Sequence, residues 1–171
     1  ADIIEEFDGR DFAWDTNEAE RKRLWQARHN AYHASCALRP ETSALSTDAC
    51  VPISRLAECV SATAKDIEAS GMIGPIVGHV GDGNFHVLLL VDTNNPEEVA
   101  TAEGIIGRLA TRAIEMDGTC TGEHGIGQGK QKYMQQEHGN ALILMEAIKA
   151  ALDPKNILNP GKIWPEALSI S

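Results

Sequence analysis

The sequence predicts an α+β fold in which helices cover an antiparallel sheet. Two apolar, β-branched runs, Ile76–Val80 and Phe85–Val91, flank the pair Asp82-Gly83. An Asp-Gly pair between such runs is a strong signal for a β-hairpin, whose strands are antiparallel. Segments with helical spacing lie before and after the hairpin, and helices interleaved with hairpin strands are typical of this fold class.

Two segments before the hairpin carry their own signals. Asn17 followed by Glu20 has the pattern of a capping box, which predicts a helix from there to about Ala34. The run Leu45–Val51 is short and partly alternating, which predicts a strand, and Pro52 ends it.

Two long amphipathic helices are expected to cover the sheet. Apolar residues keep helical spacing over Ile53–Ser70, and Gly71 supplies a stop. Asn95 caps a second such segment, which continues to Gly118. After a glycine-rich stretch, helical segments are expected up to Leu152, followed by an ordered loop.

The composition indicates one folded domain over residues 1–171 and excludes several classes of protein. The chain is 43% apolar and 23% charged, which is ordinary for a globular protein and excludes a disordered chain. A formal charge of -10 argues against binding to nucleic acid or to anionic membranes. The longest aliphatic run, Val87–Val91, is far too short to form a transmembrane segment.

The cysteines and the N-terminus bear on location. Four cysteines without a C-x-x-C pair favour reduced thiols and a cytoplasmic location over a disulfide scaffold or a zinc ribbon. The sequence begins at Ala1 without a basic and then apolar leader, which argues against export. This start also suggests a processed or excised piece.

Two histidines of the hairpin are candidate metal ligands. If the turn is centred on Asp82-Gly83, His79 lies directly opposite His86, with Cβ atoms about 5 Å apart on one face. Such a pair is able to bind one cation without bending the sheet. Because the register is assumed, the alternative is two hydrogen-bonded histidines on a polar sheet face.

The glycine-rich segment Thr119–Lys130 supplies an acid and a third histidine. Its four glycines suit a backbone that approaches a ligand closely. Two imidazoles and one carboxylate form the ligand set of a catalytic divalent site, so Glu123 is the natural third ligand. His124 is then suited to act as a general acid or base. The alternative is a turn-rich loop with a solvated Glu-His pair.

Two other features bear on ligands. The same segment fits neither phosphate-binding glycine pattern, because His124 and Lys130 stand where those patterns need glycine. Nucleotide binding through those motifs is therefore excluded. Arg28, which shares the first helix with Trp25, is suited to bind a substrate carboxylate through two hydrogen bonds. On composition alone, a surface-exposed Arg28 is the alternative.

Taken together, several motifs resemble the C-terminal domain of FAD-linked oxidases of the vanillyl-alcohol-oxidase type. The resemblance spans nearly the whole chain and is closest to the cytochrome-linked D-lactate dehydrogenases. Three motifs in the family's order are far more specific than any one of them, and they favour the metal site over its alternative. The motifs are His79–His86 (HVGDGNFH), Gly118–Gly127 (GTCTGEHGIG) and Asn159–Lys162 (NPGK), and Ser46–Leu56 and Leu24–His29 also fit.

The resemblance implies a ferredoxin-like fold and oxidation of a D-2-hydroxy acid, D-lactate first, to the 2-oxo acid with hydride transfer to FAD. Relatives that oxidise longer hydroxy diacids tend to carry a lysine near Ser46, so lactate or glycolate is favoured over D-2-hydroxyglutarate. Carried over by position, the implied ligands of zinc or manganese are His79, His86 and Glu123, the proton acceptor is His124, the substrate contacts are Arg28 and Asn84, and the flavin contact is Asn159.

The resemblance also implies partners. The family's N-terminal flavin-binding domain is absent from residues 1–171, so FAD is expected to be bound mostly by that domain of the same polypeptide. The chain alone is then expected to be inactive. The electron acceptor is left open, as are a homo-oligomer and a mitochondrial or membrane-peripheral location of the longer protein. Two other function classes are a metal- or small-ligand-binding module without redox chemistry and a structural oligomerisation domain.

Overall fold

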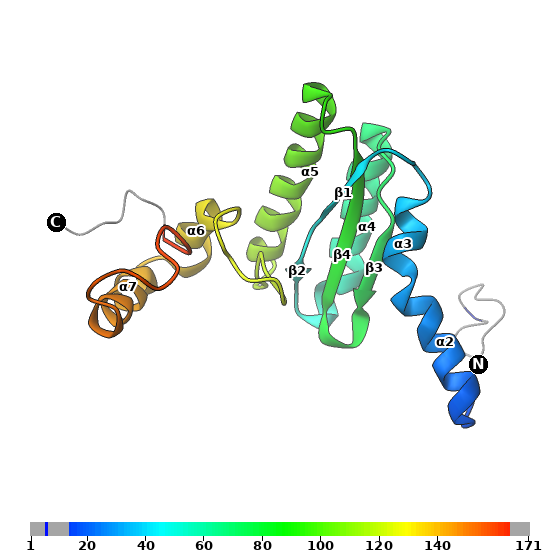
Figure 1. The fold of residues 1–171 in the computed structure, drawn as a ribbon, viewed down its shortest axis with the longest axis horizontal. Coiled ribbons are helices and arrows are strands. Elements are labelled where there is room, and N and C mark those ends of the chain that lie inside the picture. Colours follow the sequence, from blue (N-terminus) through cyan, green and yellow to red (C-terminus); the bar gives the residue numbers. More distant parts are fainter. Residues whose placement is uncertain (1–5, 7–13, 165–171) are drawn as a thin grey trace.

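The structure, a computed structural model, describes residue 6 and residues 14–164. An antiparallel sheet forms its centre, and two long helices cover one face of that sheet (Figure 1). The α+β class predicted from the sequence is confirmed. The elements in chain order are α2 (Glu18–His29), α3 (Ala31–Cys36), β1 (Ser43–Ser46), β2 (Ala49–Cys50), α4 (Ile53–Ser70), β3 (Ile76–His79), a 3-10 turn (Val80–Asp82), β4 (Asn84–Val91), α5 (Pro96–Glu115), a second 3-10 turn (Gln131–Tyr133), α6 (Met134–His138) and α7 (Ala141–Leu152).

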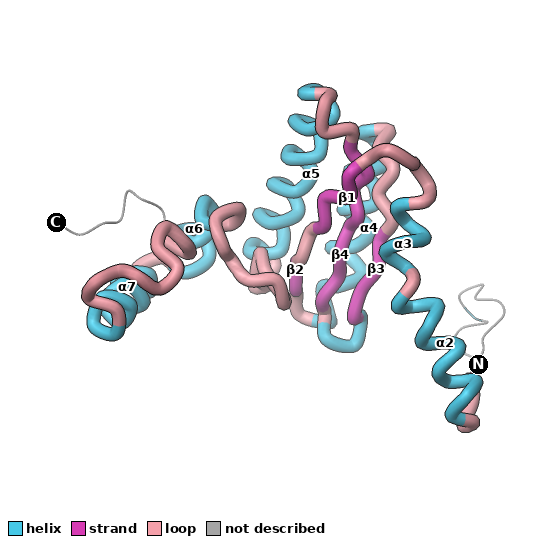
Figure 2. Tube along the Cα trace, in the orientation of Figure 1, coloured by secondary structure: helices cyan, strands magenta, loops and turns pink. Residues whose placement is uncertain are grey.

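The sheet is built around β4. This strand pairs antiparallel with β1 and β2 on one side and with β3 on the other (Figure 2). After α5, Thr119 forms an antiparallel bridge with Cys50 on the outer side of β2. The order strand, helix, strand, strand, helix and final bridge reproduces the ferredoxin-like arrangement that the family resemblance implies.

Strand alternation in β4 separates the core from the site. The side chains of Phe85, Val87 and Leu89 lie in the main core with α4 and α5, and each is at most 1% exposed. Burial of each such apolar side chain stabilises the fold by about 1.5–3 kcal/mol. The alternate residues Asn84 and His86 point to the opposite face. The polar site therefore lies on the sheet face away from the two long helices.

Both ends of α4 and the start of α5 lie where their local signals predict, whereas α5 ends at Glu115, before the expected stop at Gly118. Helix α4 has the expected bounds, and Gly71 follows it with a left-handed φ of 69°. The side chain of Asn95 accepts hydrogen bonds from the amides of Glu97 and Glu98 at the start of α5. Both helices depend on caps that are contiguous in sequence, which is why these bounds are predictable.

The first predicted helix is only partly right. The side chain of Asn17 accepts hydrogen bonds from the first-turn amides, as expected of a cap. The reciprocal half of the capping box is missing, because Glu20 pairs with Arg23 instead. Asn30 divides the expected helix into α2 and α3, and α2 buries none of its residues. No core packing is therefore present to hold one continuous helix through a poor helix former.

The expected strand over residues 45–51 is interrupted at Thr47 and Asp48. The interruption does not shift the register, since Ser46 lies opposite Leu88 in β1 and Ala49 lies opposite Phe85 in β2. Two residues thus leave the regular ladder while the strands on both sides keep the same alignment with β4.

The predicted register of the hairpin is wrong by two residues. His79 pairs with Asn84, and His86 pairs with Val77. The turn is wider than expected because Gly83, with a φ of 76°, is held by a hydrogen bond from the Val51 amide to its carbonyl. A Cβ at Gly83 would lie 2.0 Å from the Val51 carbonyl oxygen, so this close approach requires glycine.

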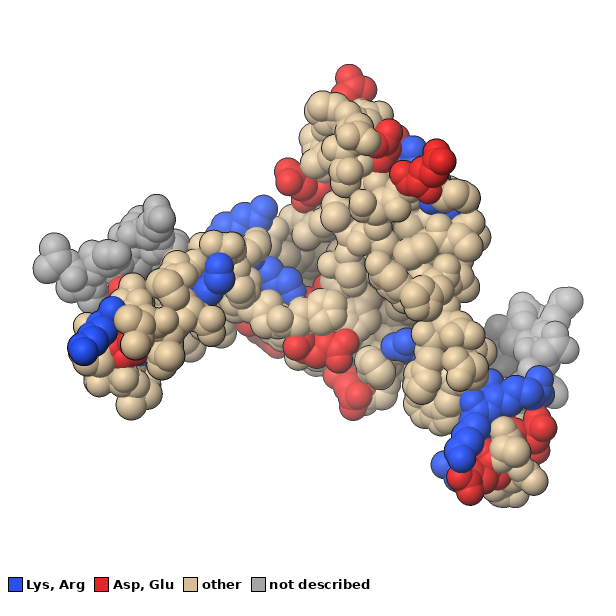
Figure 3. Space-filling view, in the orientation of Figure 1, with Lys and Arg blue, Asp and Glu red and all other residues tan. Residues whose placement is uncertain are grey.

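The chain after the glycine-rich loop forms a C-terminal arm, residues 131–164, that extends away from the sheet (Figure 1). Tyr133 anchors the arm, because it is buried with Ala110 and Cys120. Helix α7 buries only Leu142, and Figure 3 shows few charges on the arm. Its exposed apolar side chains include Ile143, Leu144, Ile148, Leu152, Ile157 and Leu158.

Candidate metal and substrate site

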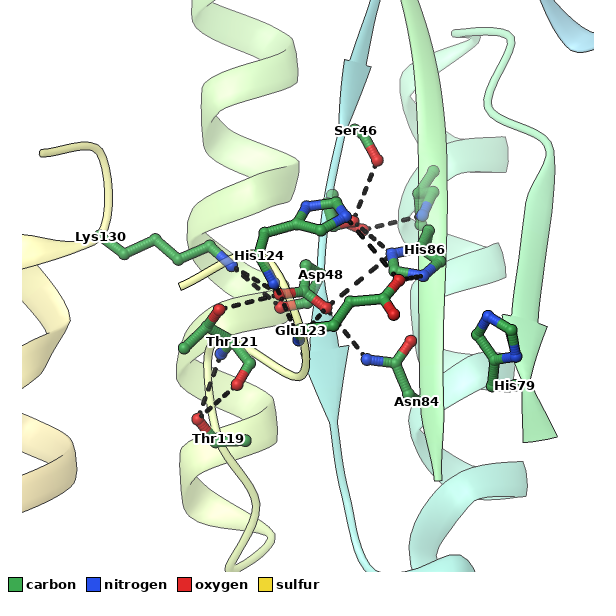
Figure 4. A network of polar contacts seen from close by, with 12 residues as sticks. Ser46, Asp48, His79, Asn84, His86, Thr119, Thr121, Glu123, His124 and Lys130 are labelled. Atoms are coloured by element: carbon green, nitrogen blue, oxygen red, sulfur yellow. Dashed lines mark hydrogen bonds and ion pairs between the residues drawn. The ribbon is translucent and has the colours of Figure 1, made fainter. Parts of the chain in front are cut away.

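The structure brings the three predicted metal ligands together (Figure 4). His79 ends β3, His86 lies in β4, and Glu123 lies in the loop after α5. One ligand atom from each lies within 4.8 Å of the other two. The register error does not separate the histidines, because a shift of two residues keeps a side chain on the same face.

The immediate surroundings of His86 define which nitrogen is free. Its Nδ1 lies 2.9 Å from the carbonyl oxygen of Thr47, and a carbonyl only accepts, so Nδ1 carries a proton. Its Nε2 lies 2.9 Å from Glu123 Oε1. Two acceptors at this distance need a proton or a cation between them. The geometry therefore suits either a charged imidazole or a metal ion shared by His86 and Glu123.

Thr47 leaves the sheet ladder in a specific way. Its hydroxyl accepts the hydrogen bond of the Val87 amide at 2.8 Å, in place of its own carbonyl. Its amide still donates to the Val87 carbonyl at 2.9 Å. The carbonyl thus freed accepts from His86 instead. The interruption between β1 and β2 therefore orients a candidate ligand.

Asp48 is the most buried charged group in the site, with no side-chain exposure. Burial alone would raise the pKa of this carboxyl. Hydrogen bonds from His124, Asn84, Glu123 and Thr121 outweigh burial and hold the pKa well below its ordinary value. Asp48 is therefore ionised in the folded chain.

A second possible ligand group shares His86 with the first. Ligand atoms of Asp48, His86 and His124 also lie within 4.8 Å of one another. The carboxylate of Asp48 is a poor candidate, because its oxygens already accept hydrogen bonds from several donors. The group of His79, His86 and Glu123 is the better metal site.

Asn84 lies on the floor of the site. Its Nδ2 donates to Asp48 Oδ1 at 3.0 Å, which turns its Oδ1 away from Asp48. This Oδ1 is buried and has no hydrogen-bond partner among the described residues. Gly122 packs directly on the amide, since a Cβ there would lie 1.8 Å from Asn84 Nδ2. Part of the glycine-rich pattern thus reflects close packing within the site.

His124 lies against the cluster with an accessible ring. Its ring stacks on that of His86, with centroids 5.2 Å apart and planes inclined by 11°. Its Nε2 lies 3.9 Å from Glu123 Oε1, and its side chain is 47% exposed. The ring is therefore placed to contact a ligand and to exchange protons with solvent.

Arg28 lies at the edge of the cluster. Its Nη2 is 3.3 Å from Nε2 of His79, and the residue is half-buried. A guanidinium only donates, so Nε2 of His79 accepts this contact with the one lone pair of the neutral ring, and Arg28 has to turn away before that lone pair binds a metal ion. The contact connects α2 to the site and argues against the fully exposed Arg28 that composition alone allowed.

Asn159 is the one predicted site residue that the structure places apart. It lies in the C-terminal arm with a left-handed φ of 47° and lines a pocket beside Lys149 of α7. Nearby, the Ile163 amide donates to the Gly127 carbonyl at 2.8 Å, which joins the arm to the glycine-rich loop. The position of Asn159 beside a flavin stays a prediction.

A family match accounts for these motifs together. The family described as "FAD linked oxidases, C-terminal domain" matches residues 1–163. The chain belongs to this family. The resemblance carried by the three sequence motifs is confirmed, and every candidate site residue of this oxidase domain lies inside the matched range.

Curated relatives of the oxidase domain are much longer than the chain itself. "Probable D-lactate dehydrogenase, mitochondrial" of Danio rerio is 51% identical and aligns with 95% of this chain and 33% of its own length. "D-lactate dehydrogenase (cytochrome), mitochondrial" of Arabidopsis thaliana is 42% identical over 95% of this chain and 29% of its own length. "Glycolate oxidase subunit GlcD" of Bacillus subtilis is 40% identical over 86% of this chain and 31% of its own length. The oxidase domain thus spans about a third of these relatives.

A solved structure supports the fold of the oxidase domain. The 4-ethylphenol oxidase from Gulosibacter chungangensis, solved as an isoeugenol complex, superposes with a TM-score of 0.60. The match covers 89% of this chain and 32% of the other at 23% identity, so it supports the fold alone. Among the helices that the structure describes, none combines the length and the apolar character needed to cross a membrane.

Sequence patterns assign no role to two residues of the oxidase domain's site, Thr47 and Asp48. Their contacts are with main-chain groups and with residues far along the chain, which no local motif records. One signal does exist in the sequence. Three consecutive polar residues, Ser46, Thr47 and Asp48, interrupt the run of residues 45–51, where a regular buried strand would be apolar throughout.

Proposed function

We propose that this domain forms the substrate side of an FAD-dependent dehydrogenase that oxidises a D-2-hydroxy acid, D-lactate first, to the 2-oxo acid. The observation that carries the proposal is the convergence of His79, His86 and Glu123 beside the accessible ring of His124. Relatives named as D-lactate dehydrogenases and as a glycolate oxidase subunit support the substrate class.

The residues present fit a divalent metal ion, for which zinc and manganese are proposed. Two imidazoles and a carboxylate leave coordination positions for a substrate. His86 also makes the second hydrogen bond, to a backbone carbonyl, that is typical of a ligating histidine. An ion held by His79, His86 and Glu123 would polarise the hydroxyl oxygen of the substrate and lower its pKa.

The chain's own residues then divide the remaining tasks. His124 takes the hydroxyl proton as the substrate C–H bond breaks and the C=O bond forms, and the hydride leaves with both bonding electrons toward the flavin. Arg28 pairs with the substrate carboxylate. Asn84 is the second proposed substrate contact, and its Oδ1 has no hydrogen-bond partner among the described residues.

FAD is proposed to be held mainly by a flavin-binding part of a longer polypeptide. Two findings support this: the domain spans about a third of its relatives, and its glycine-rich loop fits neither phosphate-binding pattern. Asn159 is the proposed contact of this domain with the flavin ring. When bound, the flavin accepts the hydride. The names of two relatives support a mitochondrial rather than a cytoplasmic location.

The short side chain at position 46 supports a small monocarboxylate. Ser46 lies at the end of β1 beside the cluster, and its hydroxyl donates to the Thr47 carbonyl at 3.2 Å (Figure 4). Where relatives of the diacid-oxidising type tend to carry a lysine, this chain has a serine. Lactate and glycolate are therefore proposed ahead of D-2-hydroxyglutarate.

The test is a substrate panel with the full-length, flavin-loaded protein and an artificial dye as electron acceptor. We expect turnover of D-lactate and glycolate to exceed that of D-2-hydroxyglutarate, with L-lactate as the stereochemical control. No turnover of any D-2-hydroxy acid, or equal turnover of both lactate enantiomers, would contradict the proposal. Retained metal binding without turnover would favour the alternative of a binding module without redox chemistry.

A further inference from the structure

Asp48 is a buried carboxylate at the centre of the site that belongs to neither the proposed ligands nor the proposed substrate contacts. Its side chain has no exposure, so it is not accessible to a substrate. A buried charge is costly unless hydrogen bonds and opposite charges compensate for it. The groups that donate hydrogen bonds to Asp48 therefore indicate its role.

Five donors surround the two oxygens of Asp48, and they come from two separate parts of the chain, β4 and the glycine-rich segment. They are the amides of Glu123 at 3.0 Å and His124 at 2.8 Å, Thr121 Oγ1 at 2.8 Å, Asn84 Nδ2 at 3.0 Å and Lys130 Nζ at 3.3 Å. Two of the donors are therefore the main-chain amides of a proposed metal ligand and of the proposed base.

The loop has few other restraints at this point. In the described part of the chain, every hydrogen bond made by the main-chain amides of residues 122–125 goes to Asp48. The side chains of Glu123 and His124 are about half exposed, at 51% and 47%, and their main contacts are with His86, so they do not fix the backbone of the loop by burial. Gly125, in the same segment, has a left-handed φ and no atoms near its Cβ position.

We infer that Asp48 is a positioning residue, whose carboxylate fixes the backbone at Glu123 and His124 and the amide of Asn84 so that their side chains converge on one point with His86. The inference rests on the proposed metal and proton-transfer roles of these residues. Asp48 acts through the loop and does not itself contact the ion or the substrate.

Asp48→Asn tests this inference with little change in shape. Either orientation of the new amide turns an NH₂ group toward donors, because both oxygens of Asp48 accept hydrogen bonds. The matched control is Glu137→Gln. Glu137 accepts from the Cys120 amide at 3.0 Å at the start of the same loop, and its side chain is 10% exposed. It makes no hydrogen bond to a proposed site residue among those described.

The first measurement is hydrogen exchange of the wild-type and variant 171-residue chains with a chelator present, so that it does not depend on a metal. In Asp48→Asn we expect the amides of Glu123 and His124 to exchange about tenfold faster or more, while amides of α4 and α5 are unchanged. Glu137→Gln should leave these two amides as in the wild type. Unchanged exchange at Glu123 and His124 in Asp48→Asn overturns the inference.

The second measurement is titration with Co²⁺, whose optical spectrum reports the ligand geometry, together with Zn²⁺ calorimetry. We expect Asp48→Asn to weaken binding about 10–100-fold and to alter the Co²⁺ bands, as loss of groups that orient ligands does elsewhere. Glu137→Gln should bind like the wild type. Wild-type affinity and spectrum in Asp48→Asn overturn the inference.

Two further outcomes are distinguishable. If the wild-type chain binds neither ion, the metal part of the proposed function fails, while the exchange measurement still decides the role of Asp48. If Asp48→Asn does not fold, Thr121→Val replaces it, since this change removes one donor to Asp48 and keeps the shape. A severalfold loss of Co²⁺ affinity is then expected, and an unchanged affinity overturns the inference.

Discussion

At the scale of single residues, His124 contacts the metal cluster without being one of its three proposed ligands. We expect His124→Ala in the full-length, flavin-loaded enzyme to lower turnover about 10²–10⁴-fold, the usual contribution of a general acid or base. Metal content should stay at the wild-type level. Steady-state kinetics and elemental analysis measure the two quantities, and His33→Ala, on an exposed part of α3, is the control.

Two results would contradict this role of His124. Unchanged turnover would exclude His124 as the proton acceptor. Loss of the metal would show that the ion is held by the second group, Asp48, His86 and His124, rather than by the group that includes Glu123.

Whether a site residue is predictable from the sequence depends on the kind of contact that it makes. His79, His86 and Glu123 are chosen by their donor chemistry, which is visible in the residue type. Thr47 acts through a main-chain carbonyl, and Asp48 acts on amides more than seventy positions away. The polar residues within the run 45–51 mark the place, but no local motif records either contact, so the contacts themselves are seen only in the folded chain.

At the scale of elements, the glycine-rich loop must pass close to β4. A Cβ on residue 122 would lie 1.8 Å from Asn84 Nδ2 and 3.0 Å from Asp48 Oδ1. We therefore expect Gly122→Ala to lower the free energy of unfolding by about 1–3 kcal/mol and to weaken Zn²⁺ binding. Urea unfolding and calorimetry provide the measurement.

Gly129→Ala is the matched control for Gly122→Ala, because a Cβ there has no atoms within 4 Å. It should behave like the wild type in both measurements. Equal behaviour of the two alanine variants would show that the loop moves away from Asn84 at little cost, and that its close approach does not matter for the site.

The hairpin shows what sequence fixes at this scale and what it leaves open. The strands and the shared face of His79 and His86 are predictable, because side chains alternate with a period of two. The exact pairing is not, because the turn widens to four residues where Gly83 packs on Val51. Contacts between distant segments decide the register, whereas caps contiguous in sequence decide both ends of α4 and the start of α5.

At the scale of the whole molecule, an ion pair between Arg39 and Glu98 fastens the start of α5 to the chain after α3. Hydrogen bonds from Arg39, and then from the Asp92 amide, lower the pKa of Glu98 from 4.5 to about 2. A carboxyl with a lowered pKa contributes stability that is fully present above its unfolded pKa and is lost as the pH falls through its folded pKa.

We therefore expect Glu98→Gln to be less stable than the wild type at neutral pH, with the difference shrinking as the pH falls from about 4.5 to about 2. Urea unfolding at a series of pH values measures this difference. Glu97→Gln is the control, since Glu97 makes no ion pair among the described residues. A difference that does not change with pH would contradict the assigned cause.

The C-terminal arm determines how the isolated chain should behave. Its exposed apolar side chains, Leu144 at 66% and Ile148 at 53% among them, form a surface of the kind that usually finds a partner. We expect the purified 171-residue chain to self-associate with rising concentration in sedimentation velocity. Joint replacement of Leu144 and Ile148 by glutamate should weaken association at least about tenfold, while Leu38→Glu on a distant exposed site should not. A monomer at every concentration would contradict the expected self-association.

The same chain should be colourless and inactive toward D-lactate with added FAD, because Asn159 alone does not bind a dinucleotide. One equivalent of flavin retained after gel filtration would contradict the expected lack of flavin binding.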